Sequence, residues 1–129
     1  MAVIRRGDAV LASSDFDPTK DEVFHRLLGG SVEFGETGEQ ALRREFREEL
    51  GAELDEVRRI DVVENLFTFD GRPGHEIVLL HEAVLRDRTL YDREDLVVLD
   101  AGSPVVWVPL AEVRAGRTRL YPASPSYLS

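Results

Sequence analysis

Apolar and polar residues alternate along the chain with two different periods, and these periods predict different elements. Short apolar or alternating segments are typical of strands. They occupy residues 2–13, 23–28, 52–69, 75–85, 96–100 and 104–110. The first segment is interrupted by the turn Arg6-Gly7-Asp8 and predicts two strands, and 52–69 predicts one or two. The unbroken apolar centre of 75–85, Ile77 to Leu80, predicts a central buried strand.

Polar segments separate these strands and predict loops or turns. They are residues 13–22, 70–74 and 86–95. Residues 110–116 predict a brief helix that ends at Gly116. The residues after it contain two prolines and little periodicity, so we expect an irregular tail.

The clearest helix is TGEQALRREFREELG, residues 37–51. Thr37 and Gln40 form a capping-box pattern, in which the hydroxyl and the amide each satisfy a free backbone N–H. Gly51 supplies the stop signal. One apolar stripe follows from the fourfold spacing of Leu42, Phe46 and Leu50.

Composition fits one folded domain over residues 1–129. The 129 residues are enough to bury a core, and a hydrophobic fraction of 43% favours a globular fold over disorder. Many strands with one strong helix predict a mixed sheet with helices packed on it. The absence of cysteine excludes disulfides, thiolate metal sites and a cysteine nucleophile.

Net charge and hydropathy limit the kinds of partner that the chain is expected to bind. The chain has 25 acidic and 16 basic side chains and a net charge of −9, which disfavours a binding face for a DNA or RNA duplex. No apolar run approaches the roughly 20 residues of a membrane span, and the first residues lack the pattern of a signal peptide. We therefore expect a cytoplasmic protein without membrane contact.

Three acids crowd one face of the predicted helix. At about 100° per residue, Glu45, Glu48 and Glu49 fall within an arc of about 100° that adjoins the apolar stripe. Such repulsion near a helix C-terminus calls for compensation, and a hard divalent cation with oxygen ligands supplies it. For the helix taken alone, a solvated face with i,i+4 ion pairs is the commoner situation.

The arginines of the same helix are placed less favourably to neutralise this arc. Arg43 and Arg47 lie nearly opposite the acids on the helical wheel, and Arg44 lies at the margin of the arc. Arg43 and Arg47 therefore cannot neutralise the arc.

The residues around this helix favour a cation site over a merely solvated helix face. Residues 30–52, GSVEFGETGEQALRREFREELGA, resemble the signature box of the Nudix hydrolase superfamily, G-x5-E-x7-R-E-U-x-E-E-x-G-U, in which U is a bulky aliphatic residue. The fixed letters match at Gly30, Glu36, Arg44, Glu45, Glu48, Glu49 and Gly51. The U positions hold Phe46 and the smaller Ala52, and RLLGG stands upstream where the family often has L-P-G-G.

The resemblance implies a fold, a cofactor and a set of roles. The implied fold is an α/β/α sandwich around a mixed β-sheet. Glu45, Glu48 and Glu49 would bind Mg²⁺, or Mn²⁺ in its place, and the carbonyl of Gly30 adds a ligand. Glu36 is similar to the acidic member of the family's structural pair.

Arg44 resembles the basic member of that pair. A paired arginine commonly fixes geometry, so scaffolding is favoured over a direct catalytic role for Arg44. Gly30 and Gly51 need only backbone freedom.

The implied reaction is hydrolysis of a phosphoric anhydride by a metal-activated water. Glu45 is the favoured general base, and Glu94 is the reserve candidate because family members also recruit the base from loops outside the box. Glu76 and Glu82 are weaker candidates.

The implied substrate is a nucleoside diphosphate linked to another group, such as a nucleoside triphosphate or a nucleotide sugar. Phe67 or Phe69 could stack on a base, and Arg72 could meet a phosphate. Strand phenylalanines more often belong to the core. Small sheet domains often pair, which is compatible with a homodimer.

Two other functions compete with the enzyme. A Nudix-fold module that senses a nucleotide without hydrolysing it would be marked by loss of box carboxylates, and all of them are present. A purely structural interaction domain leaves the acid arc unexplained.

Overall fold

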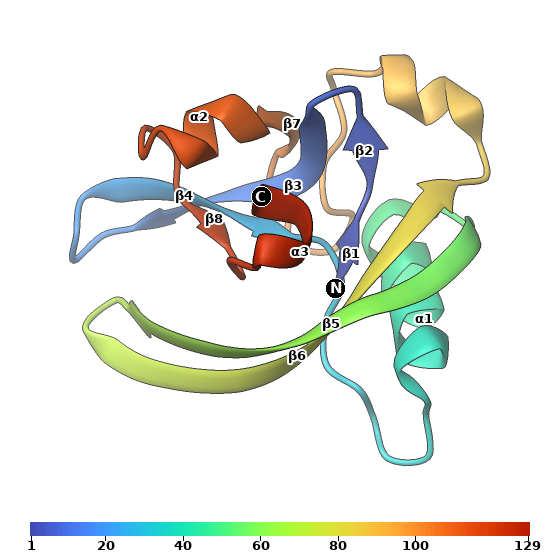
Figure 1. The fold of residues 1–129 in the computed structure, drawn as a ribbon, viewed down its shortest axis with the longest axis horizontal. Coiled ribbons are helices and arrows are strands. Elements are labelled where there is room, and N and C mark those ends of the chain that lie inside the picture. Colours follow the sequence, from blue (N-terminus) through green and yellow to red (C-terminus); the bar gives the residue numbers. More distant parts are fainter.

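The structure is a computed structural model that describes residues 1–129. One of its two sheets has three strands in the order β1-β6-β5, which span Ala2–Val3, Arg72–Leu85 and Leu54–Phe69. β1 runs parallel to β6, and β5 runs antiparallel to it. β5 and β6 form the long bent hairpin in the lower half of Figure 1.

The second sheet faces that hairpin. Its strands are β2 (Arg5–Arg6), β3 (Ala9–Asp17), β4 (Glu22–Leu27), β7 (Val105–Pro109) and β8 (Leu120–Tyr121). β3 pairs antiparallel with β2, β4 and β7, whereas β8 is parallel to β4. A bridge between Ala2 and Leu28 connects the two sheets.

Helices cover both sides of the strands and create two cores. They are α1 (Gly38–Leu50), the 3-10 helix η1 (Arg88–Asp92), α2 (Leu110–Arg114) and α3 (Pro125–Leu128). Ala2 packs into the core beneath α1, and its neighbour Val3 packs into the core beneath α2 and α3. The predicted α/β/α sandwich with mixed strand pairing is confirmed.

Helix α1 begins and ends where the sequence predicts. The Thr37 hydroxyl accepts the N–H of Gln40, and the Gln40 side chain accepts the N–H of Thr37. Gly51 ends the helix in the left-handed region, with φ of 62°. Of the predicted stripe, Leu42 and Phe46 are fully buried and Leu50 is half-buried.

The prediction of a loop over 13–22 was wrong. β3 continues to Asp17 and β4 begins at Glu22, so only residues 18–21 turn. The polar residues of this segment alternate along a strand that pairs with β4, because they face a cleft rather than a core.

The β5–β6 hairpin is longer and tighter than predicted. Its turn is Asp70-Gly71 alone, with φ of 50° and 76°, as in the two-residue turns that match the twist of paired strands. β6 is the central strand of its sheet, as predicted. Ile77, however, is 68% exposed, so the apolar run is not buried on both faces.

The predicted strand over 96–100 was also wrong, because its backbone groups are used elsewhere. The N–H of Leu99 donates to the carbonyl of Glu49 near the end of α1, and only Val97 forms a bridge, to Pro104. The tail predicted as irregular contains β8 and α3. None of the helices combines the length and the apolar character that crossing a membrane requires.

The tips of the two hairpins are held together by Asp17. Its buried carboxylate, 2% exposed, accepts the N–H groups of Thr19, Lys20 and Asp70 at 3.0–3.3 Å. The Thr19 hydroxyl donates to Asp70, and the Lys20 ammonium donates to the carbonyl of Thr68. The Thr19 and Lys20 N–H groups close the turn of the β3–β4 hairpin on this carboxylate, and the Asp70 N–H links it to the β5–β6 hairpin.

We expect Asp17→Ala to lower the free energy of unfolding by about 1–3 kcal/mol, because three backbone N–H groups lose a charged acceptor. Urea denaturation measures the change. Asp17→Asn keeps an acceptor oxygen and should be milder. An alanine variant as stable as the parent chain would contradict this role for Asp17.

Candidate active site

A cleft of about 670 Å³ opens between α1, the loop before it and the start of the β5–β6 sheet. Glu45 and Glu49 line it from α1, Gly30 from the loop, Glu76 from β6 and Arg26 from β4. We call this the acid cleft. Three of its charged side chains are carboxylates, and Arg26 is its single basic side chain.

Gly30 packs directly against the carboxylate of Glu45. A Cβ on residue 30 would lie 2.7 Å from the Glu45 carboxyl carbon and 2.8 Å from each of its oxygens. The Glu45 side chain is only 17% exposed. Any residue larger than glycine would therefore displace this carboxylate, which explains the first glycine of the box by space.

Glu49 lies beside Glu45 and is also half-buried. The backbone N–H of Gly29 points at its carboxylate at 3.4 Å. Burial first and the nearby Glu45 carboxylate second raise the pKa of the Glu49 carboxyl to about 7, although the hydrogen bond from Gly29 lowers it. Two adjacent carboxylates repel each other when both are charged, and a hard cation between them would relieve that repulsion.

Glu48 does not line the acid cleft, and its carboxylate turns toward Arg44. Its side chain is 56% exposed and accepts from the Arg44 guanidinium at 3.2 Å. Arg44 also donates to Glu45 at 2.9 Å. The helical wheel places Arg44 only at the margin of the acid arc, but its long side chain reaches back over the face that its Cα borders.

The main partner of Arg44 is Glu36. Two parallel hydrogen bonds of 2.8 and 2.9 Å join the guanidinium to both carboxylate oxygens, and a third, of 3.0 Å, reaches the carbonyl of Ser31. The hydrogen bonds from Arg44 hold the pKa of Glu36 below its ordinary value. Arg44 thus ties the loop of residues 29–37 to α1.

The residues of the acid cleft fit the divalent cation that the box implies. Glu45 and Glu49 offer oxygens side by side, the glycine loop approaches them without side chains, and Glu48 is one helical turn from Glu45. The structure brings no three His, Cys, Asp or Glu side chains together into a group that could hold a metal ion, so the protein itself would supply only part of the coordination. Mg²⁺ suits such an open arrangement, because it is usually held by few carboxylates together with waters and phosphate oxygens.

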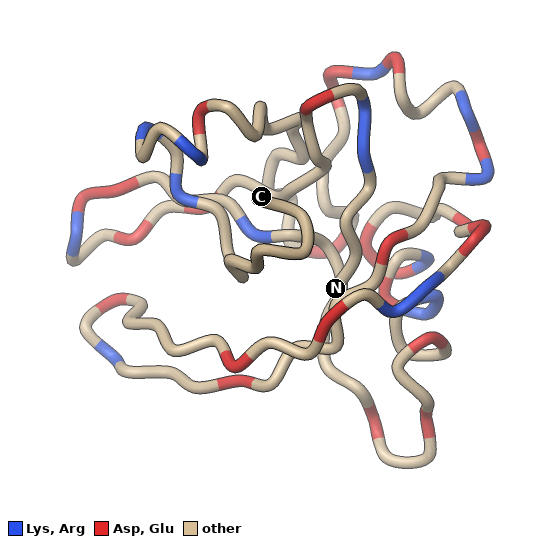
Figure 2. The backbone as a smooth tube through the Cα atoms, in the orientation of Figure 1, with Lys and Arg blue, Asp and Glu red and all other residues tan.

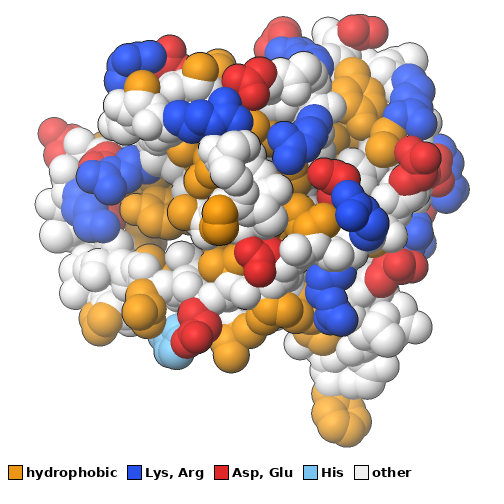
Figure 3. All heavy atoms as spheres, viewed as in Figure 1, with side chains coloured by type: hydrophobic (Ala, Val, Ile, Leu, Met, Phe, Trp, Pro, Cys, Tyr) orange, Lys and Arg blue, Asp and Glu red, His pale blue; other side chains and the backbone are white.

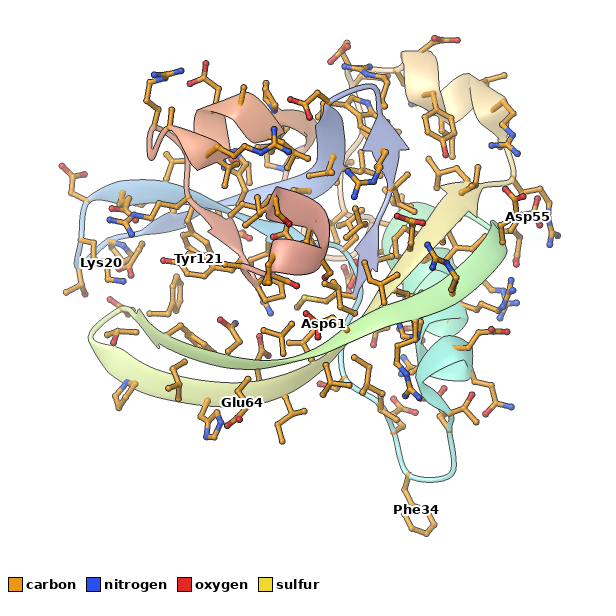
Figure 4. All side chains as sticks on the ribbon, viewed as in Figure 1. Lys20, Phe34, Asp55, Asp61, Glu64 and Tyr121 are labelled. Atoms are coloured by element: carbon orange, nitrogen blue, oxygen red, sulfur yellow. The ribbon has the colours of Figure 1, made fainter.

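A second cleft, of about 320 Å³, lies between the β3–β4 and β5–β6 hairpins. We call it the aromatic cleft, because five aromatic side chains line it: Phe16, Phe24, Phe67, Phe69 and Tyr121. Arg26 and Glu76 line both clefts, so the two adjoin. Lys20, at the outer end, and Tyr121, further in, mark its extent in Figure 4.

A polar pair stands where the clefts meet. Glu76 accepts from the amide of its cross-strand neighbour Asn65 at 2.9 Å and from Arg26 at 3.5 Å. Arg26 is held at the boundary by this carboxylate and keeps further donors available. The two clefts therefore share a charged wall that combines one basic and one acidic group.

Some of the residues predicted outside the box line a cleft, and others do not. Phe67 and Phe69 line the aromatic cleft, and base stacking by either stays a prediction, whereas Arg72 lies at the start of β6 by the hairpin turn and lines neither cleft. Glu94 also lines neither cleft and pairs with Arg6 at 3.1 Å. Glu76, one of the weaker candidates for the base, is the acid outside the box that reaches the acid cleft.

Sequence reasoning missed Arg26 and Tyr121. Arg26 stands two residues after Phe24, so both point to one side of β4, and this alternation was the available signal. Tyr121 lies in the tail that was expected to be irregular. Its place follows from the parallel pairing of Arg26 with Tyr121, which the local pattern does not reveal.

The family model described as the NUDIX domain matches residues 1–128, and the chain belongs to the Nudix family. It is therefore a hydrolase of phosphoric anhydride bonds. The resemblance carried by residues 30–52 thus extends over nearly the whole chain.

Solved structures with the same fold support this assignment. The ORF135 protein of E. coli is 26% identical, with a TM-score of 0.55, over 98% of this chain and 81% of its own. A MutT NUDIX hydrolase from Burkholderia pseudomallei is 24% identical, with a TM-score of 0.61, over 85% of this chain and 80% of its own. The E. coli dihydroneopterin triphosphate pyrophosphohydrolase is 20% identical, with a TM-score of 0.60, over 89% of this chain and 82% of its own.

Proposed function

We propose that the chain is a Mg²⁺-dependent pyrophosphohydrolase of a nucleoside diphosphate linked to another group. The observation that carries the proposal is the junction of the two clefts at Arg26 and Glu76. It allows one ligand to place a phosphate chain beside the carboxylates of α1 and a planar base among aromatic side chains. Mn²⁺ has the same preference for oxygen ligands and would serve in place of Mg²⁺.

Glu45, Glu48 and Glu49 would hold the cation, together with the carbonyl of Gly30. When bound, the cation neutralises phosphate oxygens and acidifies a water. The water oxygen attacks phosphorus, the anhydride P–O bond breaks toward the leaving phosphate, and the proton of the water passes to a carboxylate. Glu45, which is held against Gly30, is the favoured acceptor of that proton, and Glu76 replaces Glu94 as the second candidate.

Arg26 is the residue best placed to orient the phosphates. It is the single basic side chain of the acid cleft, and it also borders the aromatic cleft. Figure 2 shows acidic residues both on α1 and on the loop before it. In that field a guanidinium at the boundary favours an anionic ligand in one orientation.

A screen of nucleoside triphosphates and nucleotide sugars with Mg²⁺, Mn²⁺ or EDTA tests the proposal, with products identified by mass. The expected result is metal-dependent cleavage of a phosphoric anhydride in at least one class. Tight binding without turnover would instead support a nucleotide sensor. A chain that neither binds nor cleaves any of them would contradict both functions.

The Mg²⁺ affinity should rise with pH. Because the pKa of the Glu49 carboxyl is raised to about 7, a proton competes with the cation below that pH and leaves above it. For one competing proton with this pKa, we expect Kd to fall about tenfold from pH 6 to pH 8. Titration calorimetry measures it. In Glu49→Gln the pH dependence should shrink, and an unchanged slope in that variant would contradict the assignment.

The assembly and the compartment are expectations of the same proposal. The outer face of the β5–β6 hairpin exposes the apolar side chains Val62, Leu66 and Ile77, and Figure 3 shows apolar side chains along this edge. Phe34 projects from the loop before α1, away from the rest of the chain (Figure 4). A homodimer would cover such a surface, and light scattering tests it. We propose a cytoplasmic enzyme that acts on a small nucleotide.

A further inference from the structure

Phe67 and Gly74 are direct cross-strand partners in the β5–β6 hairpin. A Cβ on Gly74 would lie 2.3 Å from Cζ of the Phe67 ring, 2.4 Å from Cε2 and 2.9 Å from Cε1. No real Cβ stands so close to carbon. The Phe67 ring therefore lies across the bare backbone of residue 74, in space that any other residue would fill.

Backbone conformation does not explain the glycine. Gly74 is absent from the residues with positive φ, whereas Gly71, three positions earlier, has φ of 76° and needs to be glycine for the turn. An ordinary side chain could therefore be accommodated by the backbone at residue 74. What residue 74 supplies is room for the partner ring.

The ring so placed forms a wall of the aromatic cleft. Strand alternation puts Asn65, Phe67 and Phe69 on one side of β5. Phe24 packs edge-on against Phe69 at 5.7 Å and against Tyr121 at 6.1 Å between ring centroids. Phe67 belongs to neither of these pairs, so its ring contributes to the cleft without an aromatic partner.

We propose that Gly74 is a positioning residue for the ligand. By leaving the backbone bare, it lets Phe67 lie flat along β6 and keeps a slot open for a planar heterocycle. This inference rests on the proposed function in assigning the base to the aromatic cleft. It names the pair Phe67–Gly74 as the part of the chain that distinguishes a nucleotide from a bare polyphosphate.

Gly74→Ala tests the inference with little risk to the fold. The three atoms nearest to the new methyl group all belong to the outer end of the Phe67 ring, which can turn away from β6 and into the slot. The probes are the α,β-methylene analogues of ATP, GTP, CTP and UTP, with tripolyphosphate as the ligand that lacks a base. Binding is measured by calorimetry in the presence of Mg²⁺, and melting temperatures report on the fold.

We expect Gly74→Ala to bind its best nucleotide analogue about tenfold more weakly, as for loss of one stacking contact, with tripolyphosphate affinity unchanged. Phe67→Ala should give a similar loss. In the Phe67→Ala background, adding Gly74→Ala should change nothing further, because the ring it displaces is gone. Leu66→Ala, on the outer face of β5 and 72% exposed, is the matched control and should bind like the parent chain.

Three results would overturn the inference. They are equal losses for nucleotide and tripolyphosphate, additive effects of the two substitutions, or a parent chain that binds tripolyphosphate but none of the analogues. Failure of the proposed function is a separate outcome. In that case the parent chain binds nucleotides with the expected dependence on Gly74 and hydrolyses no natural nucleotide with Mg²⁺.

Discussion

Glu48→Gln is expected to abolish most of the Mg²⁺-dependent turnover while the fold survives. Glu48 is 56% exposed and packs against no core, so the change removes a charge and little else. If Glu48 helps to hold the cation, the rate should fall about a hundredfold or more, since even loss of a residue that only supports a metal ligand costs 10–100-fold. Steady-state kinetics at saturating Mg²⁺ give the comparison.

Glu39→Gln is the control for this variant. Glu39 stands on the same helix, pairs with Arg43 at 3.3 Å and lines neither cleft. It should keep the activity and the melting temperature of the parent chain. Full activity in a folded Glu48→Gln variant would count against the metal role of Glu48.

Arg44→Ala is expected to lower both the melting temperature and the rate. Arg44 fastens the loop of residues 29–37 to α1 through Glu36 and the carbonyl of Ser31, and it orients Glu45 and Glu48. Without Arg44, the loop that carries Gly30 loses its anchor, and Glu36, Glu45 and Glu48 lose the guanidinium that pairs with them. We expect the melting temperature to fall by several degrees and activity to fall at least tenfold, since the residues that orient metal ligands matter to this extent.

The matched control is Arg47→Ala, which removes an exposed ion pair with Glu53 on the same helix. Exposed pairs contribute little to stability, so this variant should melt close to the parent chain. If Arg44→Ala melts like Arg47→Ala and still loses activity, Arg44 acts on the substrate directly and the scaffolding role is wrong.

The helix and its carboxylates could be predicted from sequence because their determinants are local. The capping box of Thr37 and Gln40, the stop at Gly51 and the acid spacing all lie within one 15-residue stretch. The family pattern additionally predicted the glycine loop and the pairing of Arg44 with Glu36. The structure shows that pair as a 2.8 Å hydrogen bond between residues close in the chain.

The aromatic cleft could not be predicted in the same way. Its walls come from β3, β4, β5, β6 and β8, and pairings such as Arg26 with Tyr121 join residues far apart in sequence. Polar alternation along β3 was read as a loop because the strand faces a cleft, where carboxylates such as Asp15 replace core residues. Of the two residues predicted to meet the substrate, Phe67 lines this cleft and Arg72 does not.

Charge compensation on α1 shows a limit of helical-wheel reasoning. The wheel puts Arg44 at the edge of the acid arc, but the side chain spans far enough to donate to both Glu45 and Glu48. Repulsion among the acids is therefore relieved in part by the protein itself. The repulsion that remains is between Glu45 and Glu49, where burial and the neighbouring Glu45 carboxylate raise the pKa of Glu49.

Diffraction from crystals grown with Mg²⁺ and a methylene-bridged nucleoside triphosphate would test the central claim most directly. The account predicts a cation coordinated by oxygens of Glu45, Glu48 and Glu49 and by the phosphate chain, with the base against Phe67. A phosphate chain bound elsewhere, with no cation among these three side chains, would contradict it.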